Sequence, residues 1–369
     1  MAGGIARGGF RVSTTGIANA GRQAAGRIRG QTFIIRFAGT ESGDAVATKL
    51  IIDADPGIGD ALAVTAALLD PEVDLIALTG VAGRVSGQQA TRNLQAVVAL
   101  LDPPKWPRIG RGEGGPAITP ADDRPDPVLL NGEGGLGEFQ AYDAEPADRT
   151  ESDKLLADLV RANPNEVTLL TLGPLTNLHR ATGRDPQFLE LVGEVVCLGG
   201  AVACGGDVTA AAEFNIFADA EAARHVLRSR STVTMLPLDV SDGVTLTLDQ
   251  FDRLNADPNT RLGRLLGLLL PYYFRAHHQY LGQESVCVGE LAALAAVTAR
   301  RLFSRERMRV DVETSGELTA GATVFDRRGV AHHETNVDVF DEADTQGVID
   351  HFARLAADSR SRGGGGLEW

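Results

Sequence analysis

Short apolar runs alternate with helical patterns through most of the chain. Residues 50–52 are an apolar run that predicts a buried strand. The apolar residues that follow, at positions 62, 64, 68 and 69, indicate a helix. The alternation continues, with strands predicted at residues 73–78, 167–172, 195–198 and 232–236 and helices at residues 88–101, 154–162 and 220–227.

After Leu248 the pattern becomes more helical. Helices are predicted at residues 262–270 and 290–302, and the last one at residues 343–355. A short stretch between them, residues 308–312 and 322–325, favours strands. Alternating strands and helices predict an α/β fold: one domain with a mostly parallel central sheet, Rossmann-like, flanked by helices. Ligands of such sheets bind beyond the carboxyl ends of the strands.

The two ends of the chain differ in composition from this domain, which we place at residues 46–358. Residues 1–45 are rich in Gly, Ala and Arg and contain no acidic residue before Glu41. They fit either a disordered extension or an Arg-rich transit segment. Residues 359–369 alternate Ser and Arg before a Gly run, which predicts a flexible tail.

Charge and cysteine usage exclude several classes of protein. The formal net charge of −14 argues against binding nucleic acid through its phosphates and against a polybasic membrane anchor. No apolar run is long enough to span a bilayer. The three cysteines lack paired spacing, which predicts free thiols in a reducing, cytoplasmic compartment rather than a disulfide framework.

Three carboxylates, Asp53, Asp55 and Asp60, follow the first predicted strand directly. Acids at a helix start also favour the helix dipole, so capping is the simplest alternative. Three acids within eight positions favour a hard cation or catalysis, because oxygen ligands converge there. An EF-hand is excluded, since the twelfth position counted from Asp53 is Val64 rather than Glu.

The same segment, Asp53-Ala54-Asp55-Pro56-Gly57-Ile58-Gly59-Asp60-Ala61, resembles the amino-terminal signature of the inosine-uridine-preferring nucleoside hydrolases. Four further segments resemble family motifs in the same order, over roughly residues 48–358 in all. These are residues 83–93, with Thr91-Arg92-Asn93; residues 131–137, Asn-Gly-Glu-Gly-Gly-Leu-Gly; residues 172–178, Leu-Gly-Pro-Leu-Thr-Asn-Leu; and residues 198–223, with Leu198-Gly199-Gly200 and Ala212-Glu213-Phe214-Asn215.

The resemblance implies a single α/β domain, assembled as a homodimer or homotetramer, with Ca²⁺ at the base of the pocket. It also implies an N-glycosyl hydrolase in which Asp55 binds calcium and takes a proton from the attacking water. Asp60, the Leu172 carbonyl and Glu290 are the other implied calcium ligands. The implied substrate-binding residues are Asp207, Glu213 and Asn215, to which we add Asp53, Arg84 and His277.

The sequence departs from the family pattern at six positions, one of which is Asp207, in place of the usual Asn. Gly59 stands where an Asp is expected, and Arg84 stands where an Asn is expected. Gly289-Glu290 replaces a His-Asp pair, and Glu290 is one methylene longer than Asp. Gly289 has no group that could protonate a leaving base. Asn131 replaces a His that is common in the third motif.

Arg84 admits three interpretations. It could pair with a nearby acid at the rim of the pocket, which contributes little energy. It could bind a phosphate or carboxylate of an anionic substrate. It could also approach Asp55, Asp60 and Glu290 and partly take the place of a metal, since three carboxylates without a cation repel one another.

Four further residues have a structural and a functional interpretation. His277, beside His278, could donate a proton to a leaving group, or the two could be an exposed pair on a helix. Asp239 and Asp242, after the strand ending at Leu236, could reach the pocket, but turn or cap roles are favoured.

The leading hypothesis is hydrolysis of the N-glycosidic bond of a ribonucleoside or related N-riboside. Positive charge develops on the sugar in the oxocarbenium-like transition state, and a carboxylate-rich pocket stabilises that charge more than the ground state. Two alternatives stay open: a non-catalytic nucleoside or sugar-binding protein, and a hydrolase of another, anionic sugar derivative recognised by Arg84.

Overall fold

The computed structural model describes residues 23–28, 31–36, 47–115, 127–139, 150–254, 257–328 and 334–362. The chain divides into two units, Met1–Val46 and Ala47–Trp369. In the first unit, strands β1 (Gln23–Ile28) and β2 (Gln31–Arg36) pair antiparallel. The rest of the segment for which an extension or transit peptide was predicted lies outside the described residues, so that interpretation stays a prediction.

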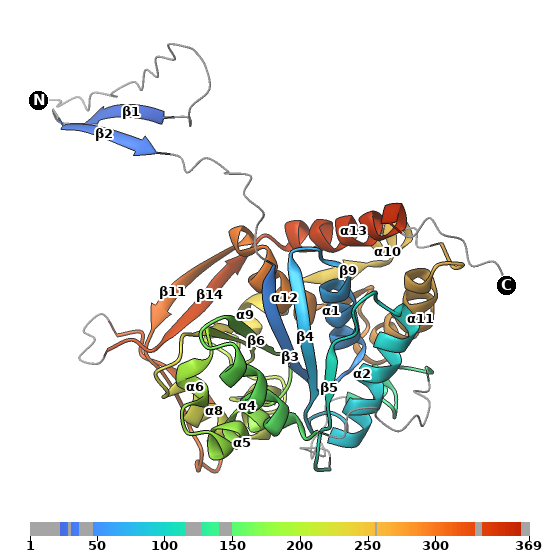
Figure 1. Ribbon diagram of the computed structural model, residues 1–369, viewed down its shortest axis with the longest axis horizontal. Coiled ribbons are helices and arrows are strands. Elements are labelled where there is room, and N and C mark those ends of the chain that lie inside the picture. Colours follow the sequence, from blue (N-terminus) through green and yellow to red (C-terminus); the bar gives the residue numbers. More distant parts are fainter. Residues whose placement is uncertain are drawn as a thin grey trace, which may run out of the picture. The chain divides into compact units, whose positions relative to one another are not determined.

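The second unit is built around an eight-stranded sheet with the order β11-β14-β8-β7-β6-β3-β4-β5 (Figure 1). All neighbouring strands are parallel except β11 and β14, which pair antiparallel. In chain order the strands are β3 (Thr48–Ala54), β4 (Val73–Gly80), β5 (Arg108–Gly110), β6 (Val167–Thr171), β7 (Glu194–Leu198), β8 (Val233–Leu236), β11 (Phe303–Met308) and β14 (Val337–Ala343).

The central strands of the sheet are buried on both faces, which explains why they are continuous apolar runs. In β3, Leu50 and Ile52 pack into one hydrophobic cluster, while Ile51 between them packs into the other. Side chains alternate between the faces of a strand, so both faces need apolar residues. A polar substitution at any of these three positions would leave an unpaired group in the core.

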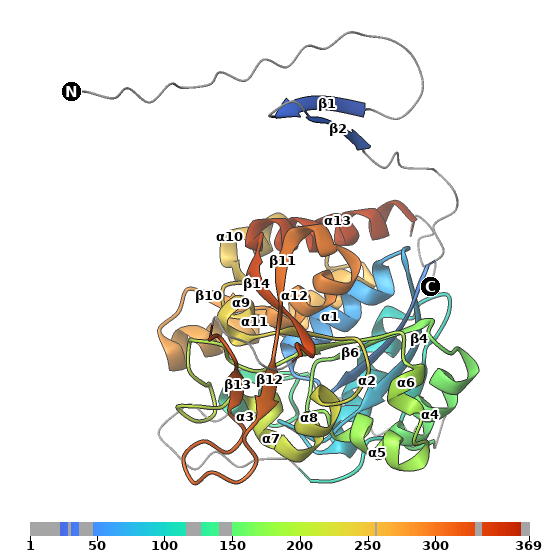
Figure 2. The same cartoon turned by 90° about the vertical axis from the view of Figure 1, so that its left-hand side faces the viewer.

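A layer of helices covers each face (Figure 2). One layer consists of α1 (Ile58–Leu69), α2 (Gly87–Leu101), α9 (Leu238–Ser241), α10 (Leu248–Leu254), α11 (Arg261–Leu281), α12 (Gly289–Thr298) and α13 (Thr345–Arg362). The other consists of α4 (Ser152–Ala162), α5 (Thr176–Arg184), α6 (Phe188–Leu191), α7 (Phe214–Ala218) and α8 (Ala220–Leu227).

The remaining elements are short. Helix α3 (Pro127–Asn131) precedes the third motif, and a 3-10 turn, η1 (Arg300–Leu302), follows α12. Strands β9 (Thr245–Thr247) and β10 (Ser285–Cys287) pair antiparallel, as do β12 (Val310–Val312) and β13 (Thr323–Phe325).

The predicted α/β fold is confirmed, and several elements lie where the pattern placed them. Three expectations near the carboxyl end need correction. The predicted helix over 290–302 ends at Thr298, the strand β14 was not predicted, and α13 runs to Arg362, four residues into the predicted tail. Residues 363–369 lie outside the described residues. Among the described helices, none combines the length and the apolar composition of a membrane span.

Candidate active site

A cavity of about 1110 Å³ opens where the central strands end. Asp55 follows β3, Leu172 follows β6, and Leu198 is the last residue of β7, and all three line the cavity. This is the edge at which parallel α/β sheets bind ligands. The lining also includes the first turns of α1 and α12, which contribute Asp60 and Glu290.

Asp55 is held in the loop between β3 and α1 and is only 3% exposed. Its Oδ2 accepts a hydrogen bond of 2.6 Å from the backbone N–H of Arg84. Burial raises the pKa of Asp55 to about 6, the Arg84 hydrogen bond and charge oppose that rise, and Glu290 adds to it. Asp55 is therefore mostly ionised at neutral pH, yet close enough to its pKa to exchange a proton.

Asp60 lies in the first turn of α1, where its Oδ2 accepts a hydrogen bond of 2.8 Å from the N–H of Gly57. This is the capping role that the sequence allowed. Its Oδ1, however, is buried and has no hydrogen-bond partner. Burial, followed by the charges of Glu290 and Asp55, raises the pKa of Asp60 well above its ordinary value. Capping therefore explains the position of Oδ2 but not that of the buried Oδ1.

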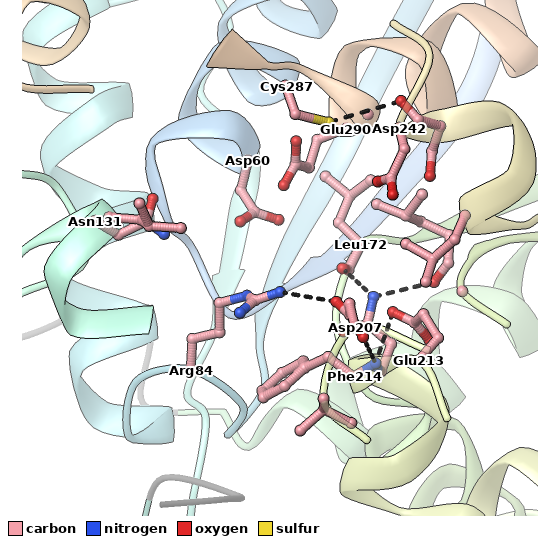
Figure 3. Close-up of a pocket in the computed structure, with 18 of the residues that line it drawn as sticks. Asp60, Arg84, Asn131, Leu172, Asp207, Glu213, Phe214, Asp242, Cys287 and Glu290 are labelled. Atoms are coloured by element: carbon pink, nitrogen blue, oxygen red, sulfur yellow. Dashed lines mark hydrogen bonds and ion pairs between the residues drawn. The ribbon is translucent and has the colours of Figure 1, made fainter. Parts of the chain in front are cut away.

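Glu290, in the first turn of α12, lines the same cavity as Asp55 and Asp60. Figure 3 shows its carboxylate beside that of Asp60. Burial raises the pKa of Glu290, and Arg84 opposes the rise. The Leu172 carbonyl, which also faces the cavity, accepts a hydrogen bond of 2.8 Å from Asn215 Nδ2. The structure thus brings the four predicted calcium ligands to one cavity.

Asp53 does not line the cavity, which corrects its predicted contact with the substrate. It is 0% exposed, and its Oδ1 accepts hydrogen bonds from Thr79 Oγ1 at 2.6 Å and Asn177 Nδ2 at 2.8 Å. Its Oδ2 is buried without a partner. Asp53 still belongs to β3, whereas Asp55 lies beyond the end of that strand. The hydrogen bonds of the Asp53 side chain therefore link β3 to β4 and α5.

Glu213 and Asn215 also line the cavity, at the start of α7. Glu213 accepts backbone hydrogen bonds from Gly200, Asn215 and Ile216, at 2.9, 2.9 and 3.1 Å. Burial raises its pKa to about 8, and Asp207 adds to the rise. Asn215 donates its Nδ2 to the carbonyls of Leu172 and Leu198, at 2.8 and 3.0 Å. Both side chains are therefore fixed in position before any ligand binds.

Arg84 extends across the cavity toward Asp207 (Figure 3). Its Nη2 lies 3.7 Å from Asp207 Oδ2, and its guanidinium carbon lies 4.2 Å from the centre of the Phe214 ring. Asp207 in turn accepts a hydrogen bond of 2.8 Å from the N–H of Phe214. The ion pair matches the interpretation of Arg84 as a residue paired to an acid. The charge of Arg84 also lowers the pKa values of Asp55, Asp60 and Glu290, so the interpretation in which it partly takes the place of a metal stays open. Phe214 was missed as a site residue, although it lies next to Glu213 in the recognised motif.

His277 and His278 have separate environments. His277 is buried and lines the cavity, and its Nδ1 lies 3.0 Å from the carbonyl oxygen of Tyr273. Burial lowers the pKa of His277, so the ring is neutral at pH 7 and Nδ1 carries the proton that this hydrogen bond requires. His278 is exposed and pairs with Glu284. The exposed-pair interpretation is thus wrong for His277 and right for His278.

Asp239 and Asp242 also differ. Asp239 accepts hydrogen bonds from the backbone N–H groups of Val202, Ala203 and Cys204 at 2.7, 2.8 and 3.0 Å, which confirms its loop-capping role. Asp242 instead lines the cavity, and burial raises its pKa. The sequence favoured a turn role for Asp242 because nothing local distinguishes it from Asp239.

Asn131 also lines the cavity and caps α1. Its Oδ1 accepts a hydrogen bond of 2.9 Å from the N–H of Ile58.

The oxygen atoms of Asp55, Asp60, Leu172 and Glu290 are the kind of ligands that suit a hard cation such as calcium. The Oδ1 atom of Asp60 is buried without a hydrogen-bond partner, and burial, together with the neighbouring carboxylates, raises the pKa values of Asp55 and Asp60. As arranged, no three His, Cys, Asp or Glu side chains in the described part of the chain form a group that could hold a metal ion. The donor atoms are thus of the kind that calcium prefers, although the side chains are not arranged as a metal site.

We expect the protein to be more stable at pH 6 than at pH 8, because it contains buried carboxyl groups with raised pKa values. Asp53, with a pKa raised by burial from 3.8 to about 7, binds its proton more tightly in the folded than in the unfolded state. The free energy of unfolding therefore falls as pH rises, by about 1 kcal/mol between pH 6 and pH 8 for Asp53 alone. Calorimetric unfolding temperatures at pH 6, 7 and 8, in chelator, measure this. Asp53→Asn should flatten the profile, and a temperature that increases with pH contradicts the assignment.

Residues 50–350 match the family described as inosine-uridine preferring nucleoside hydrolase. A non-specific ribonucleoside hydrolase, RihC, of Escherichia coli is 33% identical over 311 residues, which cover 84% of this chain and 98% of that protein. Uridine nucleosidase 1 of Arabidopsis thaliana is 34% identical over 295 residues, which cover 78% and 85%.

The fold leads to the same family. A solved structure of a purine-preferring ribonucleoside hydrolase from Gardnerella vaginalis superposes with a TM-score of 0.75 at 27% identity, covering 84% of this chain and 98% of that one. The chain belongs to the inosine-uridine preferring nucleoside hydrolase family and is thus an enzyme of the N-glycosyl hydrolase class.

Proposed function

We propose that the cavity hydrolyses the N-glycosidic bond of a ribonucleoside or a related N-riboside, with Asp55 as the general base. The observation that carries this proposal is the gathering of Asp55, Asp60, Glu290 and the Leu172 carbonyl around one buried cavity. The activities named for the relatives in Escherichia coli, Arabidopsis thaliana and Gardnerella vaginalis agree with it.

The charge of the cavity suits this reaction. Seven of the described lining residues are Asp or Glu, and Arg84 is the sole Lys or Arg among them. As the bond to the base breaks, positive charge develops on the sugar, and the carboxylates that are ionised at neutral pH, Asp55 among them, lie in place to stabilise it. The same charges repel an anionic substrate, so we do not favour the alternative in which Arg84 binds a phosphate or carboxylate.

Asp55 is the best-placed base because it combines burial, access to the cavity and a pKa of about 6. A base with this pKa is ionised at pH 7 and still accepts a proton readily from water. Its Oδ2 is fixed by the Arg84 N–H, which orients the carboxylate. An attacking water would approach its second oxygen from the cavity.

Asp55, Asp60, Glu290 and the Leu172 carbonyl are the groups that would hold calcium in this proposal. A calcium ion bound there would supply Lewis-acid charge that orients sugar hydroxyls and water. The Nδ2 group of Asn215 donates hydrogen bonds to two backbone carbonyls. Its Oδ1 is therefore the atom that can accept a hydrogen bond from a sugar hydroxyl. Glu213 holds the start of α7 and thereby keeps Asn215 in position.

His277 is the group we propose near the leaving base. With its Nδ1 proton directed at the Tyr273 carbonyl, its neutral ring offers Nε2 as an acceptor to the base. It becomes a proton donor only below its lowered pKa. Gly289, which has no side chain, contributes no acid.

The dimer or tetramer that the resemblance implies stays a prediction. Light scattering of the purified protein would measure the oligomeric state.

A nucleoside panel tests the function. The purified protein is incubated with uridine, inosine, adenosine and cytidine, in calcium and in chelator, and free ribose is measured. We expect ribose release from at least one nucleoside in calcium. Thermal stabilisation by nucleosides with no release of ribose supports the non-catalytic binding protein instead and contradicts the proposed hydrolase.

A further inference from the structure

Gly59, in the first turn of α1, lies directly against the carboxylate of Glu290. A Cβ atom added to Gly59 would overlap Glu290 Oε2 and Cδ, and would lie 2.7 Å from Oε1. Real Cβ atoms do not approach other heavy atoms this closely, so the whole carboxylate group occupies the space of a side chain at position 59. Helices α1 and α12 pack against each other, which keeps the two residues facing.

The backbone does not require glycine at this position. Gly59 lies within a regular helix and is not among the glycines with positive φ. A glycine in a helix is less favourable than alanine, by about 1 kcal/mol in exposed helix interiors. The free space above its Cα is therefore the property that distinguishes glycine here from any other residue.

Asp55 is seated in the same way, which shows that close glycines are a repeated feature of this cavity. A Cβ added to Gly83 would overlap Asp55 Oδ2, and one added to Gly173 would lie 2.5 Å from Asp55 Oδ1. The pair of Gly59 and Glu290 differs from the contacts of Asp55 with Gly83 and Gly173 in one respect. Both members of this pair depart from the family pattern, since Gly59 and Glu290 each stand in place of Asp.

We propose that Gly59 is a positioning residue for Glu290, and that the two departures form one coupled pair. The missing side chain at position 59 provides the space in which the longer Glu290 side chain brings its carboxylate into the cavity. One carboxylate, carried by α12, then occupies the space that a side chain on α1 would fill. The functional importance of this pair rests on the proposed hydrolase activity, while the coupling itself does not.

A double-mutant cycle tests the pair, using Gly59→Ala, Glu290→Asp and the double variant. The added methyl group meets the far end of a flexible side chain, so Gly59→Ala displaces the Glu290 carboxylate. We expect at least a tenfold loss of kcat/KM, an unfolding temperature that differs from that of the wild type, and weaker calcium binding by titration calorimetry. Glu290→Asp shortens the side chain by one methylene. When Gly59→Ala is already present, this shortening relieves the overlap, so the double variant should be at least tenfold more active than the product of the two single effects.

Gly267→Ala is the matched control, because Gly267 is a helical glycine of α11 with nothing within 4 Å of an added Cβ. We expect this variant to keep its activity and to unfold at the same or a higher temperature. Wild-type behaviour of Gly59→Ala, or strictly additive effects in the double variant, overturns the proposal. If the wild type hydrolyses no nucleoside, the proposed function fails, and the unfolding temperatures of the same four proteins still decide whether the two residues are coupled.

Discussion

Asp55→Asn is expected to lower kcat/KM by about 10³-fold while leaving the unfolding temperature at or above that of the wild type. The substitution keeps the shape of the side chain, and the Asn oxygen can still accept the 2.6 Å hydrogen bond from the Arg84 N–H. It removes the carboxylate that takes the proton from water. It also removes a buried negative charge beside Glu290, which is why stability is not lost.

The opposite directions of these two effects make the test specific. A residue needed only for folding would lose stability and activity together. The matched control is Asp158→Asn, an exposed residue of α4 that pairs with Lys154 at 2.6 Å and should change neither property. If Asp55→Asn retains activity within a few-fold of the wild type, another group is the base.

The second large effect is expected from calcium and from Asp60→Asn. Chelation of divalent ions should reduce the rate of nucleoside hydrolysis by at least about 10²-fold, and calcium should restore it. At 100 times its dissociation constant, calcium should also stabilise the folded protein by about 2.7 kcal/mol. Asp60→Asn should abolish the restoration and the stabilisation, because the unpartnered Oδ1 is the atom we assign to the ion.

Glu284→Gln is the control for this experiment. Glu284 lines the outer part of the cavity, is exposed and pairs with His278, so its substitution should leave the calcium response intact. An unchanged unfolding temperature in millimolar calcium, together with full activity in chelator, contradicts the calcium assignment. That outcome would favour Arg84 as the positive charge beside these carboxylates. Asp55 and Glu290 both raise the pKa of Arg84.

The strands and helices around the cavity were predictable because both faces of the sheet are buried. Continuous apolar runs such as residues 50–52 and 195–198 are visible in the sequence. Strand β14 was missed because its burial changes along its length, from Val337 in the core to Glu342 in solvent. One of its two partners, β8, is far away in the sequence, since Val337 pairs with Val233, so this pairing is not visible locally.

The site was predictable where the motif fixes a residue, and less so where packing decides its role. Glu290 lines the cavity with Asp55 and Asp60, as expected. Asp53 was misjudged because its distance from the cavity depends on hydrogen bonds with Thr79 and Asn177, which are distant in sequence. Asp242 was undervalued because only the fold shows which of two neighbouring acids turns toward the cavity.

The Gly59 and Glu290 pair illustrates the same limit. Each departure from the family pattern is visible in the sequence. Their compensation appears only when α1 and α12 are packed together.

A crystal structure of the protein with calcium and a ribose-like inhibitor would test the proposed site most directly. We expect one cation bound by Asp55, Asp60, Glu290 and the carbonyl oxygen of Leu172, with the sugar between that cation and Asn215. A cation or inhibitor bound elsewhere, or a Glu290 side chain turned away from the two aspartates, would contradict it.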